Sequence, residues 1–298
     1  MNARERELRL PHLTLAAREW GDPGATPVLA LHGWLDNAAS FDALAPLLGD
    51  AHVLALDFPG HGRSQHRPAG AWYHYIDYLG DVLAAADALE WQRFVLLGHS
   101  LGGAVASVLA AAAPERVLQL WAIEAMGPLS TAPAKATELL RRAMAERGLI
   151  AAKSLRVFDD LERAVAARMQ ANGLSEAAAR ALVVRGTRAV AGGYEWSSDP
   201  RLTMTSAIRL TEEQVLAYLA GIECPALAIM ADPPPPWMDR EQMARRMAQV
   251  RGLEQVVLPG SHHLHLEDPQ PVADAIATFR ARYPQATGDL SRKVPASP

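Results

Sequence analysis

Cysteine, long apolar runs and excess charge are all scarce in this chain of 298 residues. The single cysteine, Cys224, excludes an internal disulfide and fits a reducing compartment. No apolar run approaches the roughly 20 residues that a membrane-spanning helix needs. The charged start, Met1–Glu7, lacks the apolar core of a signal peptide. We therefore expect a cytoplasmic protein with no membrane partner.

The charge balance also indicates which kinds of partner the chain can bind. The chain has 29 Lys and Arg residues against 33 Asp and Glu residues, a net charge of -4. This balance provides no basic field for nucleic acid. Half of the residues are hydrophobic (50%), so a sizeable core can be buried. We expect a small-molecule substrate, no nucleic acid partner, and a monomer or homodimer.

Strand-like apolar runs alternate with helical segments over the first third of the chain and again near its end. The expected strands are 13–20, 28–31, 52–56, 94–97, 117–123, 225–230 and 255–258, and the expected helices include 41–48, 75–89 and 271–283. Such alternation predicts an α/β fold with a mostly parallel central sheet flanked by helices on both faces.

The strand pattern stops between residues 126 and 222. This segment is rich in Ala, Arg and Glu, shows no convincing strand, and predicts helices at 141–147, 161–170 and 175–185. We therefore expect a core made of residues 1–125 and 223–283, interrupted by a helical insertion over 126–222. The polar, proline-bearing tail 284–298 is expected to be disordered.

A Gly-x-Ser-x-Gly pentapeptide lies between the expected strand 94–97 and an alanine-rich helical run, 104–113. It consists of Gly98, His99, Ser100, Leu101 and Gly102. At such a strand-to-helix corner, a serine occupies a strained turn with its hydroxyl exposed, and the flanking glycines relieve the crowding. This context predicts that Ser100 is a nucleophile.

A serine nucleophile needs a base, and three histidines follow the last expected strand: His262, His263 and His265. Because parallel strands end at one edge of the sheet, this loop should reach Ser100. We choose His262, which comes first after the strand, and expect His265 to pack or hydrogen-bond within the next turn. The trio has no matching carboxylate or cysteine spacing, so we assign no metal site.

The loop after the strand at 28–31 offers the other requirement of acyl chemistry, backbone donors for an oxyanion. Its residues are His32, Gly33 and Trp34. The expected donors are the backbone N–H groups of Trp34 and of Leu101, the residue after the serine.

Taken together, these motifs resemble the α/β-hydrolase superfamily. The resemblance covers the His32-Gly33 loop, the turn Asp57–Ser64, the elbow 98–102 and a terminal histidine in family order. It implies the α/β-hydrolase fold, a Ser-His-acid triad without a cofactor, a structural role for the turn, and a helical cap over the active site at 126–222. Two segments, Asp199–Leu202 and Arg209–Gln214, are similar to the serine hydrolase-like subgroup.

The triad acid departs from the family pattern. Most relatives carry an aspartate three residues beyond a glycine after the strand at 225–230, but here those positions hold Ala231 and Pro234. Two substitutes remain: Asp232, two residues early, and Glu124, which follows the strand at 117–123. We favour Glu124, since its apolar flanks predict a buried carboxylate that needs a partner such as an imidazole.

The resulting hypothesis is a serine hydrolase that acts on a small carboxylic ester through Ser100, His262 and Glu124. The same triad would serve thioester, amide or carbon–carbon bond hydrolysis, and a non-catalytic binding protein on the same fold is a further alternative. Four tryptophans, at positions 34, 72, 196 and 237, line an apolar pocket or simply pack.

Overall fold

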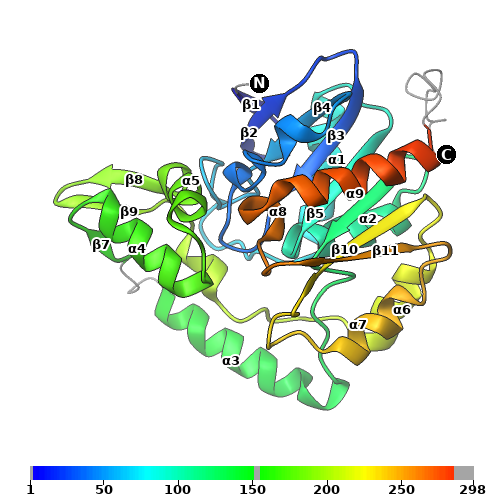
Figure 1. Ribbon diagram of the computed structural model, residues 1–298. Coiled ribbons are helices and arrows are strands. Elements are labelled where there is room, and N and C mark those ends of the chain that lie inside the picture. The colour runs from blue at the N-terminus through cyan, green and yellow to red at the C-terminus, as the bar shows by residue number, and fades with distance from the viewer. Residues whose placement is uncertain (1–2, 151–154, 285–298) are drawn as a thin grey trace.

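A central sheet organises the computed structural model, which describes residues 3–150 and 155–284 (Figure 1). Its strand order is β1-β2-β4-β3-β5-β6-β10-β11. The strands are β1 (Arg4–Arg9), β2 (Thr14–Trp20), β3 (Thr26–Leu31), β4 (Ala51–Leu56), β5 (Phe94–His99), β6 (Val117–Ile123), β10 (Ala226–Asp232) and β11 (Glu254–Pro259). β2 pairs antiparallel with β1 and β4, and the remaining pairs are parallel.

Helices cover both faces of this sheet, which confirms the expected α/β architecture. One face packs against α1 (Asp77–Ala88), α2 (Leu101–Ala112), α6 (Glu212–Ala220) and α7 (Arg240–Met247). The other packs against α9 (Pro269–Arg282), the short α8 (Leu264–Glu267), and the 3-10 segments η1 (Ala38–Phe41) and η2 (Ala45–Leu47). Side chains of β3 alternate between the two clusters, Leu29 and Leu31 facing one and Val28 and Ala30 the other, as the period of a strand requires.

Two local predictions for the first fifty residues differ from the structure. The helix expected at 41–48 is replaced by η1 and η2, and Pro46 explains the break, because proline lacks the N–H that a continuous helix would use there. Strand β1 was not expected. It buries only Leu8 and alternates charged residues on its exposed positions, so it carries no apolar signal.

Residues 126–222 contain strands as well as helices, contrary to the prediction of a purely helical insertion. The segment includes α3 (Ala136–Leu149), α4 (Leu161–Asn172) and α5 (Glu176–Gly186). A three-stranded sheet, β7 (Val157–Phe158), β9 (Gly193–Trp196) and β8 (Thr187–Val190), lies beside α4 and α5, and together they form one lobe (Figure 1). Strands of two to four residues are too short to show a period of two. The last helix, α6, packs with Val215 and Leu219 in the main core.

Buried polar contacts join α5 to the sheet. Nε of Arg185 lies 3.0 Å from both carboxylate oxygens of Asp57, and Nη1 donates to Glu5 at 2.7 and 2.8 Å. The Asn37 amide donates to the Leu182 carbonyl at 2.8 Å. These contacts attach the lobe to the loops at the ends of β3 and β4.

Two expectations from the sequence concern membrane-spanning helices and the C-terminal tail. Within 3–150 and 155–284, no helix is long and apolar enough to cross a membrane. The tail expected to be disordered lies, except for Pro284, outside the described residues.

Replacing Phe279 tests how far α9 stabilises the sheet. This ring is fully buried against the second cluster, so Phe279→Ala should lower the free energy of unfolding by about 3–5 kcal/mol. Urea denaturation followed by circular dichroism measures the change. Thr278→Ala, at an exposed position of the same helix, should change stability by less than about 0.5 kcal/mol.

Candidate active site

Ser100 sits at the corner between β5 and α2 in a strained backbone conformation. Its φ is +51° and its ψ is −112°, a region that non-glycine residues rarely occupy. The two flanking glycines make this corner sterically allowed. A Cβ at Gly98 would lie 2.4 Å from the Gly102 carbonyl oxygen, and a Cβ at Gly102 would lie 1.9 Å from the Leu31 carbonyl oxygen.

Backbone hydrogen bonds tie the corner to neighbouring strands. The Ser100 N–H donates to the Ile123 carbonyl at 3.0 Å, and the Gly102 N–H donates to the His32 carbonyl at 3.0 Å. Ser100 is partly exposed, and its hydroxyl has no hydrogen-bond partner among the described residues. Catalytic hydrogen bonds commonly tighten only around bound substrate, so this geometry is compatible with a nucleophile.

His262 and Glu124 lie together beside this corner. Nδ1 of His262 is 3.1 Å from Oε2 of Glu124, whose side chain is fully buried. The other oxygen, Oε1, accepts from the Ala231 N–H at 2.6 Å. A carboxylate only accepts, so the His262 proton is assigned to Nδ1 and Nε2 keeps its lone pair. His262 can therefore act as a base whose ring is oriented by the Glu124 carboxylate.

The backbone of Glu124 directs its side chain to this position. Its φ is +57°, and its N–H donates to the Ile229 carbonyl of β10 at 2.9 Å. The residue thus leaves the end of β6 in a left-handed conformation and turns toward the loop after β11.

Asp232, the other candidate acid, is not brought to His262. It ends β10 at an exposed position, and its carboxylate has no hydrogen bond or ion pair with any residue in the described ranges. Its carbonyl accepts from the Gly260 N–H at 3.2 Å. Asp232 therefore contributes backbone to the histidine loop and no side chain.

The expected oxyanion donors, Trp34 and Leu101, lie on two loops joined by the Gly102–His32 hydrogen bond. Neither backbone N–H finds an acceptor in the part of the chain that the structure describes. Leu101 opens α2, where the helix dipole favours negative charge. His32 fixes the loop, with Nδ1 donating to the Gly33 carbonyl at 2.7 Å and Nε2 accepting from the Phe58 N–H at 3.0 Å. Burial lowers the pKa of His32 to about 4, so the ring is neutral.

The remaining histidines form a buried group behind His262. His265 is bonded through Nε2 to the Ser40 hydroxyl at 2.8 Å, and its ring centroid lies 4.2 Å from that of His99. His263 faces Asp36, with 3.3 Å between Nε2 and Oδ2. Burial holds the pKa of His99 at about 3 and that of His265 well below its usual range. His265 therefore packs and hydrogen-bonds against η1, and not within the turn that follows it as predicted.

Asp36, His99 and His263 offer one ligand atom each within 4.8 Å of one another, and all three are buried. Asp36 is the carboxylate that the spacing of residues in the sequence did not reveal. Arg168 already donates to the other oxygen of Asp36. Its guanidinium supplies the positive charge that a divalent ion would bring, so we derive no metal-dependent step from this group.

A cavity of about 100 Å³ adjoins the oxyanion loops. Trp34 and Leu101 line it, together with aromatic side chains that include Trp72, Tyr73 and Tyr75. The Trp34 indole donates to the Leu202 carbonyl at 3.0 Å, which fixes one wall.

Of the other tryptophans, Trp237 packs edge-on against His262 at 4.9 Å between ring centroids. Trp196 packs against Phe158, away from the site, at 5.3 Å.

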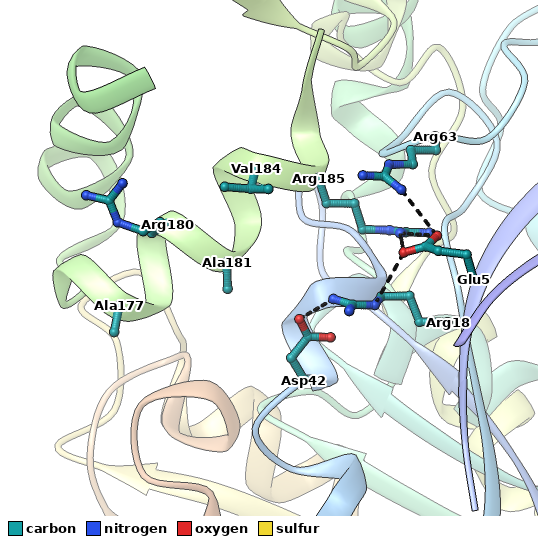
Figure 2. A pocket seen from close by; sticks show the side chains of 9 residues that line it. All are labelled: Glu5, Arg18, Asp42, Arg63, Ala177, Arg180, Ala181, Val184 and Arg185. Atoms are coloured by element: carbon teal, nitrogen blue, oxygen red, sulfur yellow. Dashed lines mark hydrogen bonds and ion pairs between the residues drawn. The ribbon is translucent and has the colours of Figure 1, made fainter. Parts of the chain in front are cut away.

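A larger cavity, of about 450 Å³, lies between α5 and the β1–β2 edge (Figure 2). Its arginines are already paired. Figure 2 shows Arg18, Arg63 and Arg185 directed at Glu5, whereas Arg180 points away. Arg180 is bonded instead to Glu162 and Glu176. None of the candidate catalytic residues lines this cavity, so we do not assign the active site to it.

Comparison with known proteins decides the family. A family model described as alpha/beta hydrolase fold matches residues 26–147. A probable serine hydrolase from Drosophila melanogaster is 34% identical over 288 residues, which cover 92% of this chain and 87% of the relative. Serine hydrolase-like protein 2 from Homo sapiens is 32% identical over 295 residues, which cover 92% of this chain and 93% of that relative. The chain belongs to the α/β-hydrolase superfamily, in its serine hydrolase-like group.

A solved structure agrees with this membership. A hypothetical protein from Pseudomonas aeruginosa PAO1 matches with a TM-score of 0.89 at 40% identity, covering 96% of this α/β-hydrolase and 100% of that chain. The α/β-hydrolase fold expected from the motifs is therefore confirmed.

Of the three remaining family-like segments of this α/β-hydrolase, 57–64 and 199–202 fix loops, and 209–214 contains the capped start of α6. In the turn 57–64, the carboxylate of Asp57 accepts from the Ala38 and Arg63 N–H groups at 2.7 and 2.8 Å, and the Ser64 hydroxyl donates to the Asp57 carbonyl at 2.6 Å. In the segment 199–202, Arg201 is bonded to the Asp199 carboxylate at 2.6 Å. The buried Asp36 and the half-buried Arg168 were missed because they lie 132 positions apart and fit no motif.

Gly102→Ala tests the steric constraint at the corner. Because the added Cβ would lie 1.9 Å from Leu31 backbone, we expect a loss of several kcal/mol in unfolding free energy, at or above the upper end of about 1–3 kcal/mol for overpacking. Thermal denaturation measures it. The matched control is Gly80→Ala in α1, where nothing lies within 4 Å; this change should stabilise the helix by about 0.5–1 kcal/mol.

Proposed function

We propose that this protein is a serine hydrolase that cleaves a small carboxylic ester through Ser100, His262 and Glu124. The observation that carries the proposal is the contact of 3.1 Å between His262 Nδ1 and the buried Glu124 carboxylate. It lies beside a serine in a strained corner. Family membership supports hydrolysis, and the arrangement of side chains supports an acyl-enzyme route.

The proposed reaction proceeds in two halves. The Ser100 oxygen attacks the ester carbonyl carbon while Nε2 of His262 takes the hydroxyl proton, and the Trp34 and Leu101 N–H groups stabilise the oxyanion. When the intermediate collapses, His262 gives that proton to the departing alcohol. Water then attacks the acyl-enzyme, its proton passes to His262 and on to the Ser100 oxygen, and the carboxylic acid leaves. Glu124 stabilises the imidazolium in both halves.

The small cavity beside the oxyanion loops supports a compact apolar group on the substrate. Its volume of about 100 Å³ accommodates a few non-hydrogen atoms, and Trp34, Trp72 and Tyr75 are among the residues that form its walls. We propose that this group is the acyl part of the ester, because the cavity adjoins the donors that would hold the carbonyl oxygen. We further propose that the enzyme works in the cytoplasm.

Ser100→Ala should abolish turnover of a short-chain p-nitrophenyl ester, with a fall of at least about 10³-fold in kcat because no other group can form the acyl-enzyme. Release of p-nitrophenolate gives the rate. Labelling by a fluorophosphonate probe should disappear in parallel. A wild-type protein that neither turns over such esters nor labels would contradict the proposal and favour a non-catalytic binding protein on the same fold.

Glu124→Gln and Asp232→Asn separate the two candidate acids. Glu124→Gln keeps the size of the side chain but removes the charge that orients His262, so kcat should fall by about 10²–10⁴-fold. Asp232→Asn should leave kcat within about twofold, since this exposed carboxylate contacts no described residue. The reverse pattern would transfer the role to Asp232.

A further inference from the structure

Asp36 connects two loops of the site to the lobe. It lies two residues beyond Trp34, is 3% exposed, and its N–H closes a turn on the Gly33 carbonyl at 3.1 Å. Oδ2 is 3.3 Å from Nε2 of His263, the residue next to the proposed base. Oδ1 accepts from Arg168, which comes from α4 in the lobe. The oxyanion loop, the histidine loop and the lobe therefore meet at one carboxylate.

His99 extends this connection to the nucleophile corner. Its Nε2 lies 2.8 Å from the His262 carbonyl oxygen. A carbonyl only accepts, so Nε2 carries the proton and directly holds the backbone of the proposed base. Nδ1 lies 3.7 Å from Asp36 Oδ2 and has no hydrogen-bond partner within the described residues. A Cβ at Gly33 would lie 2.8 Å from Asp36 Oδ2 and 2.9 Å from His99 Nδ1, so the loop after β3 packs closely against the end of β5 here.

The charges of this cluster are balanced. Burial opposes ionisation of Asp36, but the hydrogen bond with His263 and the charge of Arg168 hold its pKa well below its usual range. His99 is neutral, since burial lowers its pKa to about 3. The Asp36–Arg168 ion pair is largely removed from solvent, with 2% and 12% of the two side chains exposed. Such a pair contributes little net stability against a hydrophobic replacement, yet it is costly to leave half of it unpaired. Its main effect is therefore to fix geometry.

We propose that Asp36 is a positioning residue of the active site, which holds the His262 loop against the oxyanion loop and couples both to the lobe through Arg168. This inference rests on the proposed function for its effect on rate, but the positioning itself is independent of catalysis. Asp36 does not touch the reacting atoms in this scheme. It acts through His263 and through the packing around His99.

Asp36→Asn is the direct test, with Asp81→Asn as its matched control. Asp81 is equally buried, at 2% exposure, and likewise pairs with one histidine and one arginine, His12 and Arg67, but it lies on α1. Both variants should lose similar unfolding free energy. Only Asp36→Asn should lower kcat, by about 10–100-fold, with KM within about threefold, because misplacement of a base slows the chemical step. The rates are compared at a temperature where both variants are folded by circular dichroism.

Amide hydrogen exchange provides a readout that does not need activity. In Asp36→Asn, residues 32–36 and 260–265 should exchange at least about tenfold faster than in wild type, and in Asp81→Asn they should not. If the wild-type protein has no esterase activity, the proposed function fails while this exchange result still decides the positioning role. Exchange and kcat in Asp36→Asn equal to those of Asp81→Asn would overturn the proposal.

Arg168→Gln tests the same connection if Asp36→Asn does not fold. This change removes only the connection to the lobe, because the contact with His263 remains. We expect faster exchange in α4 and in residues 33–38, with a loss of kcat smaller than about tenfold. Unchanged exchange in both segments would show that the lobe is not coupled to the site through Asp36.

Discussion

The close approach of Gly102 to Leu31 is the steric constraint on which the site depends. Because residue 102 has no side chain, the start of α2 lies directly against the end of β3. That contact allows the hydrogen bond of 3.0 Å from the Gly102 N–H to the His32 carbonyl, which brings the loop after β3 and the start of α2 together. The left-handed conformation of Ser100 is maintained by this packing, since an isolated chain would not hold it.

Three buried carboxylates follow three parallel strands of the sheet, β3, β4 and β6, and they differ in their partners. Asp36 after β3 and Asp57 after β4 pair with arginines of the lobe, Arg168 and Arg185. Glu124 after β6 instead pairs with an imidazole, that of His262. A buried carboxylate needs a partner, and a guanidinium stays charged at any working pH whereas an imidazole can give up its proton. Asp36 also contacts an imidazole, 3.3 Å from Nε2 of His263, but that ring is buried, whereas the His262 ring beside Glu124 is partly exposed.

The sequence was informative where a function depends on a local backbone shape. The corner around Ser100, the His32-Gly33 loop and the alternation of strands and helices all follow from neighbouring residues. Strand β1 and the short strands of the lobe were missed because they bury few side chains and have no period to detect. The contact between Asp36 and Arg168 could not be predicted, because it joins residues 132 positions apart whose local context is that of ordinary surface charges.

The proline-rich loop after β10 explains how the site can form without an acid at the usual position. Although Pro234 cannot supply a carboxylate, the Ala231 N–H donates to Glu124 Oε1 at 2.6 Å. Farther along, Trp237 packs edge-on against the His262 ring. The end of β10 therefore contacts Glu124 through its backbone, and the loop that follows contacts His262 through an aromatic ring. Because β6 and β10 are paired neighbours, a glutamate at the end of β6 reaches the same imidazole that an acid on this loop would reach. A carboxylate one strand away from the usual position can thus contact the same histidine.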